Sequence, residues 1–355
     1  MFRHPFLIGT LAAVFSVFLG ALECNRQVRT PVEVRGERIY GRMCAVCHGP
    51  NGEGYRADEA PAVGKRAFLG TASDVFMRRA INDGRTGTTM SAWSTAHGGP
   101  LSGPDVDAVI AYLRTLQPGA PVAVDQHQQA GHVEEGARLF ERECARCHGA
   151  RGTGGPNVGI GNPELLASAT DAFLRHAITN GRPETAMPSF GEKLGKQGVD
   201  DVLAHLRDLQ RQAAPPPPEP PAPPPPIPLG PVPLNPKGPE PAGFQKAPAT
   251  THAELIHSEL ERGAKMAILD ARAPQDYRNG HIAGAVSVPF YDVQPYVTKL
   301  PKNAWLVAYC ACPHAESGQL AQRLLEAGFE KVTILDEGLG FWRSKHFATH
   351  EGDDP

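Results

Sequence analysis

The sequence predicts a multidomain protein with two all-α domains followed by one α/β domain that has a mostly parallel sheet. Three observations carry this prediction. One sequence pattern occurs twice before residue 213. A stretch dominated by proline comes next. After that stretch, helical and strand-like runs alternate, which favours an α/β fold.

Composition narrows the functional class. The 355 residues fit two or three domains. A hydrophobic fraction of 41% excludes a wholly disordered chain. The formal net charge of -3 gives no basic field, so we expect no nucleic-acid partner. The cysteines form two Cys-x-x-Cys pairs, one Cys-x-Cys pair and the single Cys24, a pattern typical of cofactor chemistry rather than of a disulfide framework.

Residues 1–24 are predicted to direct the chain out of the cytoplasm. An apolar run from Phe6 to Leu22 follows the basic Arg3, as in secretory signals. Cys24 is the candidate lipid anchor, although Glu23 stands where a lipoprotein site has a small residue. Lipidation, plain secretion and an uncleaved anchor stay open. All three predict a periplasmic protein, and two of them tether it to the membrane.

The repeated pattern contains a haem-attachment motif. The sequence Cys-Ala-Val-Cys-His at 44–48 recurs as Cys-Ala-Arg-Cys-His at 144–148. Two thiols one helical turn apart can each form a thioether to a haem vinyl, and the histidine that follows can lie under the iron. Residues 76–81 and 106–114 also match 173–178 and 199–207, so haem is favoured over a redox dithiol or a zinc site. We predict two covalently bound haem c groups, attached at Cys44, Cys47, Cys144 and Cys147.

These residues resemble the class I cytochrome c family in its tandem, dihaem form. The resemblance implies two cytochrome c domains, at 30–118 and 130–212. In each, a short helix would run into the haem motif and a C-terminal helix would cross it through an aromatic contact. Tyr112 has the place for that contact. His205 has it in the second copy, where we expect weaker packing and a helix-packing role rather than ligation.

The same resemblance implies histidine and methionine ligation of each iron. The proximal ligands would be His48 and His148, and the sixth ligands Met90 and Met187. Pro188 follows the second methionine as in the family, whereas Ser91 follows the first.

Three other residues were candidate ligands. Met43 and Met77 are expected to fill the core, and His97 is a weaker alternative ligand for the first haem. Two filled axial positions favour electron transfer over haem catalysis. A dihaem peroxidase would need one open or weakly held axial position.

Residues 213–248 are predicted to be a proline-rich linker. Runs of four prolines start at Pro215 and Pro223. Such a segment cannot form a helix or a sheet ladder and favours polyproline II. We expect a semi-rigid spacer, which makes a fixed interface between the two halves unnecessary.

The α/β domain is predicted at 249–350. Helices are expected at 253–262 and 317–327, and buried strands at 266–270, 305–309 and 332–335. Leu269-Asp270-Ala271-Arg272 and the run 280–285 resemble the first signature of rhodanese domains. The resemblance implies that Asp270 and Arg272 brace the sheet edge and that His281 is not catalytic.

The resemblance also places a nucleophilic cysteine, Cys310, directly after a strand and before a helix. A helix N-terminus lowers a thiol pKa. The thiolate would take sulfur from a sulfane-sulfur donor, hold it as a persulfide and pass it to a thiol acceptor. Cys312 is either a resolving thiol or the true nucleophile. Glu316 stands in the loop instead of the family's arginine, which puts thiosulfate in doubt and argues against phosphate.

Two functional hypotheses follow. The first is an exported dihaem electron-transfer protein that couples sulfane-sulfur handling at Cys310, by a rhodanese-type sulfurtransferase activity, to electron transfer through two haems. The alternative is a pure electron carrier whose rhodanese-like domain is an inactive binding or sulfur-carrier module. The expected partners are redox proteins of a respiratory chain, a sulfane-sulfur donor, a thiol acceptor and the membrane through the N-terminus.

Overall fold

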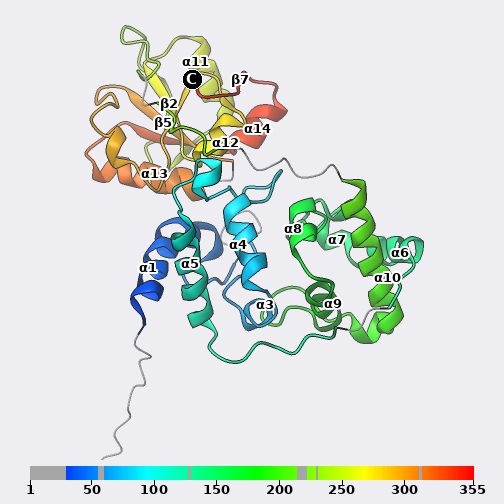
Figure 1. Cartoon of the computed structure of the whole chain (residues 1–355). Helices are drawn as coiled ribbons and strands as arrows, with labels where there is room; N and C mark the ends of the chain where they lie inside the picture. Colours follow the sequence, from blue (N-terminus) through cyan, green and yellow to red (C-terminus); the bar gives the residue numbers. More distant parts are fainter. Residues whose placement is uncertain (1–28, 55–59, 127–128, 214–221, 229–230, 312–313) are drawn as a thin grey trace, which may run out of the picture.

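The computed structural model describes residues 29–54, 60–126, 129–213, 222–228, 231–311 and 314–355. Figure 1 shows a helical domain in blue and cyan, a second one in green, and an α/β domain in yellow to red. The predicted fold class is therefore confirmed. Cys24 and the predicted export segment 1–24 lie outside the described residues. Within the described part, no helix has the length and apolar character needed to cross a bilayer.

The first helical domain begins with a capped helix. The Thr30 hydroxyl accepts a hydrogen bond from the Glu33 amide, and the Glu33 carboxylate accepts one from the Thr30 amide. This capping box fixes where the helix starts. The elements in order are α1 (Pro31–Ile39), a π-helical turn (Tyr40–Cys44), α2 (Ala45–His48), α3 (Arg66–Leu69), α4 (Asp74–Asp83), a 3-10 turn (Thr95–His97) and α5 (Gly103–Leu116).

The second helical domain repeats this order. Its elements are α6 (Val133–Glu143), α7 (Ala145–His148), a 3-10 turn (Ala150–Gly152), α8 (Pro163–Ser168), α9 (Asp171–Asn180) and α10 (Gly191–Gln212). Gly195 interrupts the first turns of α10 with φ 63°. The last helix of this domain is therefore kinked, and it is longer than its counterpart α5.

The first and last helices of each domain cross at a glycine. A Cβ atom on Gly36 would lie 1.9 Å from the Ala108 carbonyl oxygen of α5. A Cβ atom on Gly136 would lie 1.9 Å from the Asp201 carbonyl oxygen of α10. Only glycine permits so close an approach of two backbones.

An aromatic contact supports each crossing. Tyr40 and Tyr112 have ring centroids 5.3 Å apart. Phe140 and His205 have the same separation. His205 thus packs between helices as predicted, although the ring separation does not show the weaker packing that we expected.

The two helical domains meet through matching surfaces. Phe76 of α4 packs on its repeat counterpart Phe173 of α9, with ring centroids 5.0 Å apart. The guanidinium of Arg85 lies over the Phe76 ring, and its counterpart Arg182 lies over the Phe173 ring. Phe68 contacts both phenylalanines. The repeat in the sequence is therefore also a repeat in the interface.

The α/β domain is built on a five-stranded parallel sheet with strand order β1-β6-β5-β2-β4. Two buried clusters show that α11 and α14 cover one face and α13 the other. The five strands of this sheet are β1 (Thr250–Thr251), β2 (Met266–Asp270), β4 (Ala285–Ser287), β5 (Trp305–Tyr309) and β6 (Val332–Leu335). Two further short strands, β3 (His281–Ile282) and β7 (Thr349–His350), pair with each other. The helices are α11 (Ala253–Glu261), α12 (Pro274–Arg278), α13 (Ala315–Glu326) and α14 (Gly338–Ser344).

The predicted strands of this domain match β2, β5 and β6. The remaining strands were not predicted, because runs of two or three residues carry no periodic signal. Helix α13 begins at Ala315, two residues before the predicted start.

The proline-rich segment differs from the prediction of a simple spacer. Its described residues form neither helix nor strand, as expected. However, Asn235 Nδ2 donates to the Gly263 oxygen at 2.7 Å, and the Ala247 amide donates to the Val332 oxygen at 2.7 Å. The C-terminal part of the segment is therefore attached to the α/β domain.

The first helical domain and the α/β domain also share an interface. Trp93 packs on Tyr291 with ring centroids 5.5 Å apart, and on Phe290 at 6.4 Å. Helix α2 contacts helix α13. Arg42 donates to the Tyr291 oxygen. The linker makes such an interface unnecessary, and the structure nevertheless contains one between the first helical domain and the α/β domain.

Candidate functional site

The first Cys-x-x-Cys-His motif lies where α1 passes into α2. Cys44 ends the π-helical turn, and Cys47 and His48 lie in α2. Neither cysteine forms a disulfide. His48 Nδ1 lies 2.9 Å from the Pro61 carbonyl oxygen, a contact that orients the ring and leaves Nε2 as the ligating atom. Burial lowers the pKa of His48, which favours the neutral imidazole that a metal needs.

The second motif has the same geometry. Cys144 precedes α7, and Cys147 and His148 lie within it. His148 Nδ1 lies 2.8 Å from the Val158 carbonyl oxygen. Both copies thus offer two thiols without a disulfide and one oriented imidazole, which is the donor set that haem c requires.

The two predicted methionine ligands lie in equivalent loops. The Arg85 amide donates to the Met90 oxygen at 2.8 Å, and the Arg182 amide donates to the Met187 oxygen at 3.0 Å. Each methionine amide in turn donates to the threonine hydroxyl two residues earlier. Both side chains are partly buried. A thioether from each loop would complete a donor set that fits haem c.

The competing candidates have other contacts. Met43 and Met77 are core residues with 8% and 3% exposure, as predicted. His97 Nε2 lies 3.4 Å from Asp83 Oδ1, so this ring is engaged by a carboxylate.

Cys310 directly follows β5 in the α/β domain, and Cys312 lies outside the described residues. The Cys310 side chain is only 1% exposed, and its Sγ lies 3.3 Å from the Ser317 hydroxyl of α13. The Leu339 amide holds the Cys310 carbonyl at 3.0 Å. The thiol is therefore positioned by α13 and α14 and shielded from solvent.

Glu316 is buried in the first turn of α13. Burial raises the pKa of its carboxyl well above the usual range, and the neighbouring Cys310 and Asp276 act in the same direction. Burial therefore favours the protonated form of this carboxyl. The expected repulsion between Glu316 and an anionic substrate is thereby weakened.

The rhodanese-like signature residues brace the sheet, as the resemblance implied. Arg272 forms a two-pronged ion pair with Asp270, with Nε–Oδ1 at 2.9 Å and Nη2–Oδ2 at 2.6 Å. The Tyr309 hydroxyl donates to Asp270 at 2.6 Å. His281 is fully buried, and its ring stacks on Tyr277. These contacts are structural and lie at the carboxyl ends of β2 and β5.

One hydrogen bond connects the methionine loop to this region. The Ser91 hydroxyl donates to Asp276 Oδ2 of α12 at 2.5 Å. Burial raises the pKa of the Asp276 carboxyl, although this hydrogen bond and Arg272 act in the opposite direction. The sequence reasoning missed this contact. The available signal was the pair of positions where the first copy departs from the second, Ser91 for Pro188 and Trp93 for Phe190.

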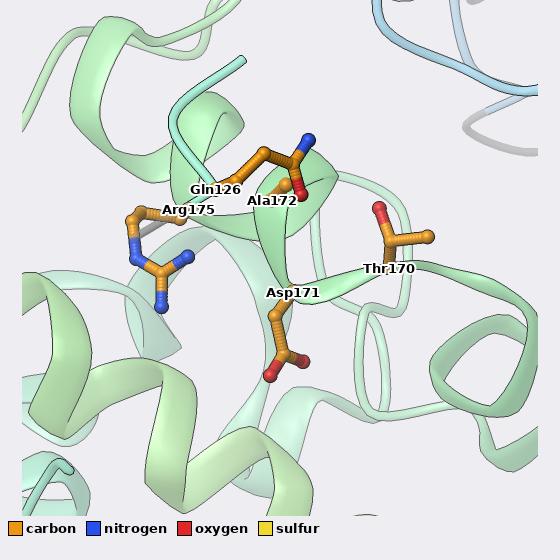
Figure 2. Close-up of a pocket in the computed structure, with 5 residues that line it drawn as sticks. All are labelled: Gln126, Thr170, Asp171, Ala172 and Arg175. Carbon is orange, nitrogen blue, oxygen red and sulfur yellow. The ribbon is translucent and has the colours of Figure 1, made fainter. Parts of the chain in front are cut away.

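Two other polar clusters are explained by contacts within the protein. A pocket beside α9 is lined by Asp171 and Arg175, together with Gln126, Thr170 and Ala172 (Figure 2). Its charged groups are already paired, Arg175 with Asp200 and Asp171 with Arg207. We call the segment 310–314, between β5 and α13, the sulfur loop. At its C-terminal end His314 Nε2 lies 3.2 Å from Asp336 Oδ1, as part of an ion-pair network around His252.

Three family models match separate segments of the chain. The cytochrome c model covers residues 33–117, the model for subunit III of cbb3-type cytochrome c oxidase covers 131–206, and the rhodanese-like domain model covers 252–345. The chain is a tandem c-type cytochrome with a C-terminal rhodanese-like domain. It accordingly carries two covalently bound haem c groups.

Individual relatives match parts of this tandem cytochrome. The cbb3-type cytochrome c oxidase subunit CcoP of Azospirillum brasilense is 26% identical over 212 residues, which are 56% of this chain and 69% of that protein. Cytochrome c6 of a Synechococcus species is 31% identical over 86 residues, 22% of this chain and 71% of that protein. The chain covers 61% of a second CcoP, from an Azospirillum species, at 29% identity.

The rhodanese-like domain of an Anabaena protein, known as a solution structure, is 32% identical to this chain. The match covers 29% of this chain and 78% of that domain, with a TM-score of 0.28.

Proposed function

We propose that this protein is an exported dihaem electron carrier in which sulfur chemistry at Cys310 delivers electrons to the haems, with the first haem as the entry point. The observation that carries the proposal is the shared interface. Helix α13, which follows the sulfur loop, contacts the haem-motif helix α2, and Ser91 beside Met90 is bonded to Asp276. Cys310 and Asp276 both raise the pKa of the buried Glu316 carboxyl in α13.

The chain's own residues hold the haems. Cys44 and Cys47 would attach one group and Cys144 and Cys147 the other, with His48, Met90, His148 and Met187 as axial ligands. Haem c supplies one-electron oxidation and reduction. The Pro61 and Val158 carbonyls orient the two imidazoles, and the Arg85 and Arg182 amides hold the two methionine loops.

The sulfur step begins with the Cys310 thiolate. It attacks the outer sulfur of a donor R–S–SH, forming Cys310–S–SH and releasing R–S⁻. After loss of its proton, the persulfide joins a thiolate acceptor as Cys310–S–S–S–R and releases two electrons. Each haem would accept one electron, so the two haems together would take up the two electrons that this step releases. Cys312 is the candidate resolving thiol: its thiolate would attack Sγ of Cys310, release R–S–S⁻ and leave a Cys310–Cys312 disulfide, which a thiol reductant returns to two thiols.

We further propose that the protein works in the periplasm, tethered through residues 1–24, with a respiratory protein as electron acceptor. The relatives that are subunits of cbb3-type oxidases support a respiratory partner.

A second candidate is supported by a specific observation. Cys310 is 1% exposed, which is typical of an inert core thiol rather than of a nucleophile that meets a soluble donor. In that case the rhodanese-like domain would be a binding module, and the haems would receive electrons from elsewhere.

One anaerobic experiment separates the two candidates. Glutathione persulfide is added to the oxidised holoprotein, and the haem α-band is followed in the wild type, Cys310→Ser and Cys312→Ser. The proposal predicts rapid reduction that Cys310→Ser abolishes, and slower turnover with a normal first reduction in Cys312→Ser. Equal reduction in the wild type and in both cysteine variants, or no reduction in any of them, would support the inactive module, whereas reduction lost only in Cys312→Ser would make Cys312 the nucleophile.

A further inference from the structure

The two methionine loops have the same backbone hydrogen bonds but are stiffened in different ways. In the second domain Pro188 follows Met187. A proline has a fixed φ and restricts the residue before it to extended conformations. This constraint is covalent and belongs to the loop itself.

The first loop lacks this constraint. Ser91 takes the place of the proline, is 5% exposed, and donates its hydroxyl to Asp276 of the rhodanese-like domain. Trp93, two residues further on, packs on Tyr291 and Phe290 of the same domain, whereas its counterpart Phe190 makes no ring contact within the described residues. In the first loop, a hydrogen bond and an aromatic contact to the rhodanese-like domain thus take the place of the proline in the second loop.

We propose that Asp276 is a positioning residue for the first haem, acting through Ser91 on the loop that presents Met90. The rhodanese-like domain then sets how firmly the first iron keeps its methionine, while the second iron is independent of it. This inference rests on the proposed role of Met90 as the sixth ligand. Because methionine ligation raises a haem potential, a loosened loop lowers the potential of the first haem only.

The test is a redox titration of the holoprotein, with the methionine–iron charge-transfer band of the oxidised protein as a second readout. In Asp276→Ala and in Ser91→Ala we expect one of the two potentials to fall and the band to lose up to half its intensity. Asp276→Asn retains an acceptor oxygen and should stay close to the wild type. Ser91→Pro copies the second loop, so adding Asp276→Ala to it should change nothing further.

Two control variants make the outcome specific. Asp292→Ala removes a negative charge from the same interface without touching the loop, and simple loss of negative charge raises a potential rather than lowering it. Met90→Leu tests the ligand assignment itself. If Met90→Leu changes neither readout, the assignment fails and the inference with it.

A different pattern would overturn the positioning role alone. If Met90→Leu lowers one potential but Ser91→Ala and Asp276→Ala leave both unchanged or raise them, Met90 is the ligand and Asp276 does not position it.

Discussion

The two cytochrome domains share a scaffold and differ in what surrounds it. Both cross their terminal helices at a glycine and hold a histidine against a backbone carbonyl. Arg114 and Arg207 on the last helices bond Asp74 and Asp171 in the same way. Among the residues that the structure describes, the first domain alone contacts the rhodanese-like domain through its methionine loop. The same scaffold is therefore found with different surroundings at the two methionine loops.

The sharpest contrast is an ion pair that both copies contain. Arg78 pairs with Asp107 in the first domain, where the side chains are 42% and 52% exposed. The counterpart pair of Arg175 and Asp200 is 9% and 2% exposed. The segment through Gly131, which runs close over the Asp200 backbone, contributes to this burial.

This contrast gives the largest expected effect. Asp200→Ala leaves a buried arginine without a partner and should lower the free energy of unfolding by about 4 kcal/mol. Asp107→Ala should cost less than about 1 kcal/mol, because both side chains of its ion pair with Arg78 are exposed to solvent. Denaturant unfolding followed by circular dichroism measures both. Similar losses in the two variants would contradict the structural difference.

Substitution of the glycine at either helix crossing should lower the stability of the protein by a similar amount. Gly36→Ala and Gly136→Ala each force a methyl group against a carbonyl oxygen, and each should lower stability by about 3 kcal/mol. Gly103→Ala is the control, because a Cβ atom there has no neighbour within 4 Å and should leave stability almost unchanged. A tolerated Gly136→Ala would show that the second crossing is looser than the first.

The division of the chain into two cytochrome domains and one α/β domain could be predicted from the sequence. The repeated Cys-x-x-Cys-His motif and the matched helices gave the two domains, and the alternation of runs gave the α/β domain. The burial of Arg175 and the partner of Ser91 could not be predicted, because both depend on segments distant in the chain; the departure from the second copy at Ser91 marked the position but not the contact. The contacts of the linker could not be predicted for the same reason: composition excludes helix and strand but does not say which surface an extended segment contacts.

The position of Cys310 in the sulfur loop was predicted correctly, but the protonation of the neighbouring Glu316 was not. The place of Cys310 followed from the strand that ends at Tyr309. The charge of Glu316 was judged from residue type, whereas its protonation depends on burial that only the folded domain provides.

Glu316 should make stability depend on pH in one direction. The folded protein keeps the Glu316 proton after the unfolded chain has lost its own, so stability falls as pH rises above the usual glutamate range. Glu316→Gln should therefore raise the melting temperature at pH 8 but hardly at pH 4. The exposed Glu330→Gln is the control. An equal shift at both pH values would mean that Glu316 is ionised in the folded state.

The smallest effect is expected where the two cytochrome domains exchange polar contacts. Lys65 Nζ lies 2.7 Å from Glu184, while Asn162, the counterpart of Lys65, donates to the Thr86 carbonyl at 3.0 Å. Lys65→Ala should cost below about 0.5 kcal/mol, because the Glu184 carboxylate is 62% exposed. A loss above about 1 kcal/mol in denaturant unfolding would show a stronger dependence of the interface on this pair.

The central claim is that sulfur chemistry at Cys310 supplies electrons to the haems. The most direct measurement is an anaerobic titration of the oxidised holoprotein with glutathione persulfide, in which the reduced haem is counted per protein molecule. The account predicts that both haems become reduced in the wild type and that neither does so on the same timescale in Cys310→Ser. Full reduction of both haems in Cys310→Ser would contradict it.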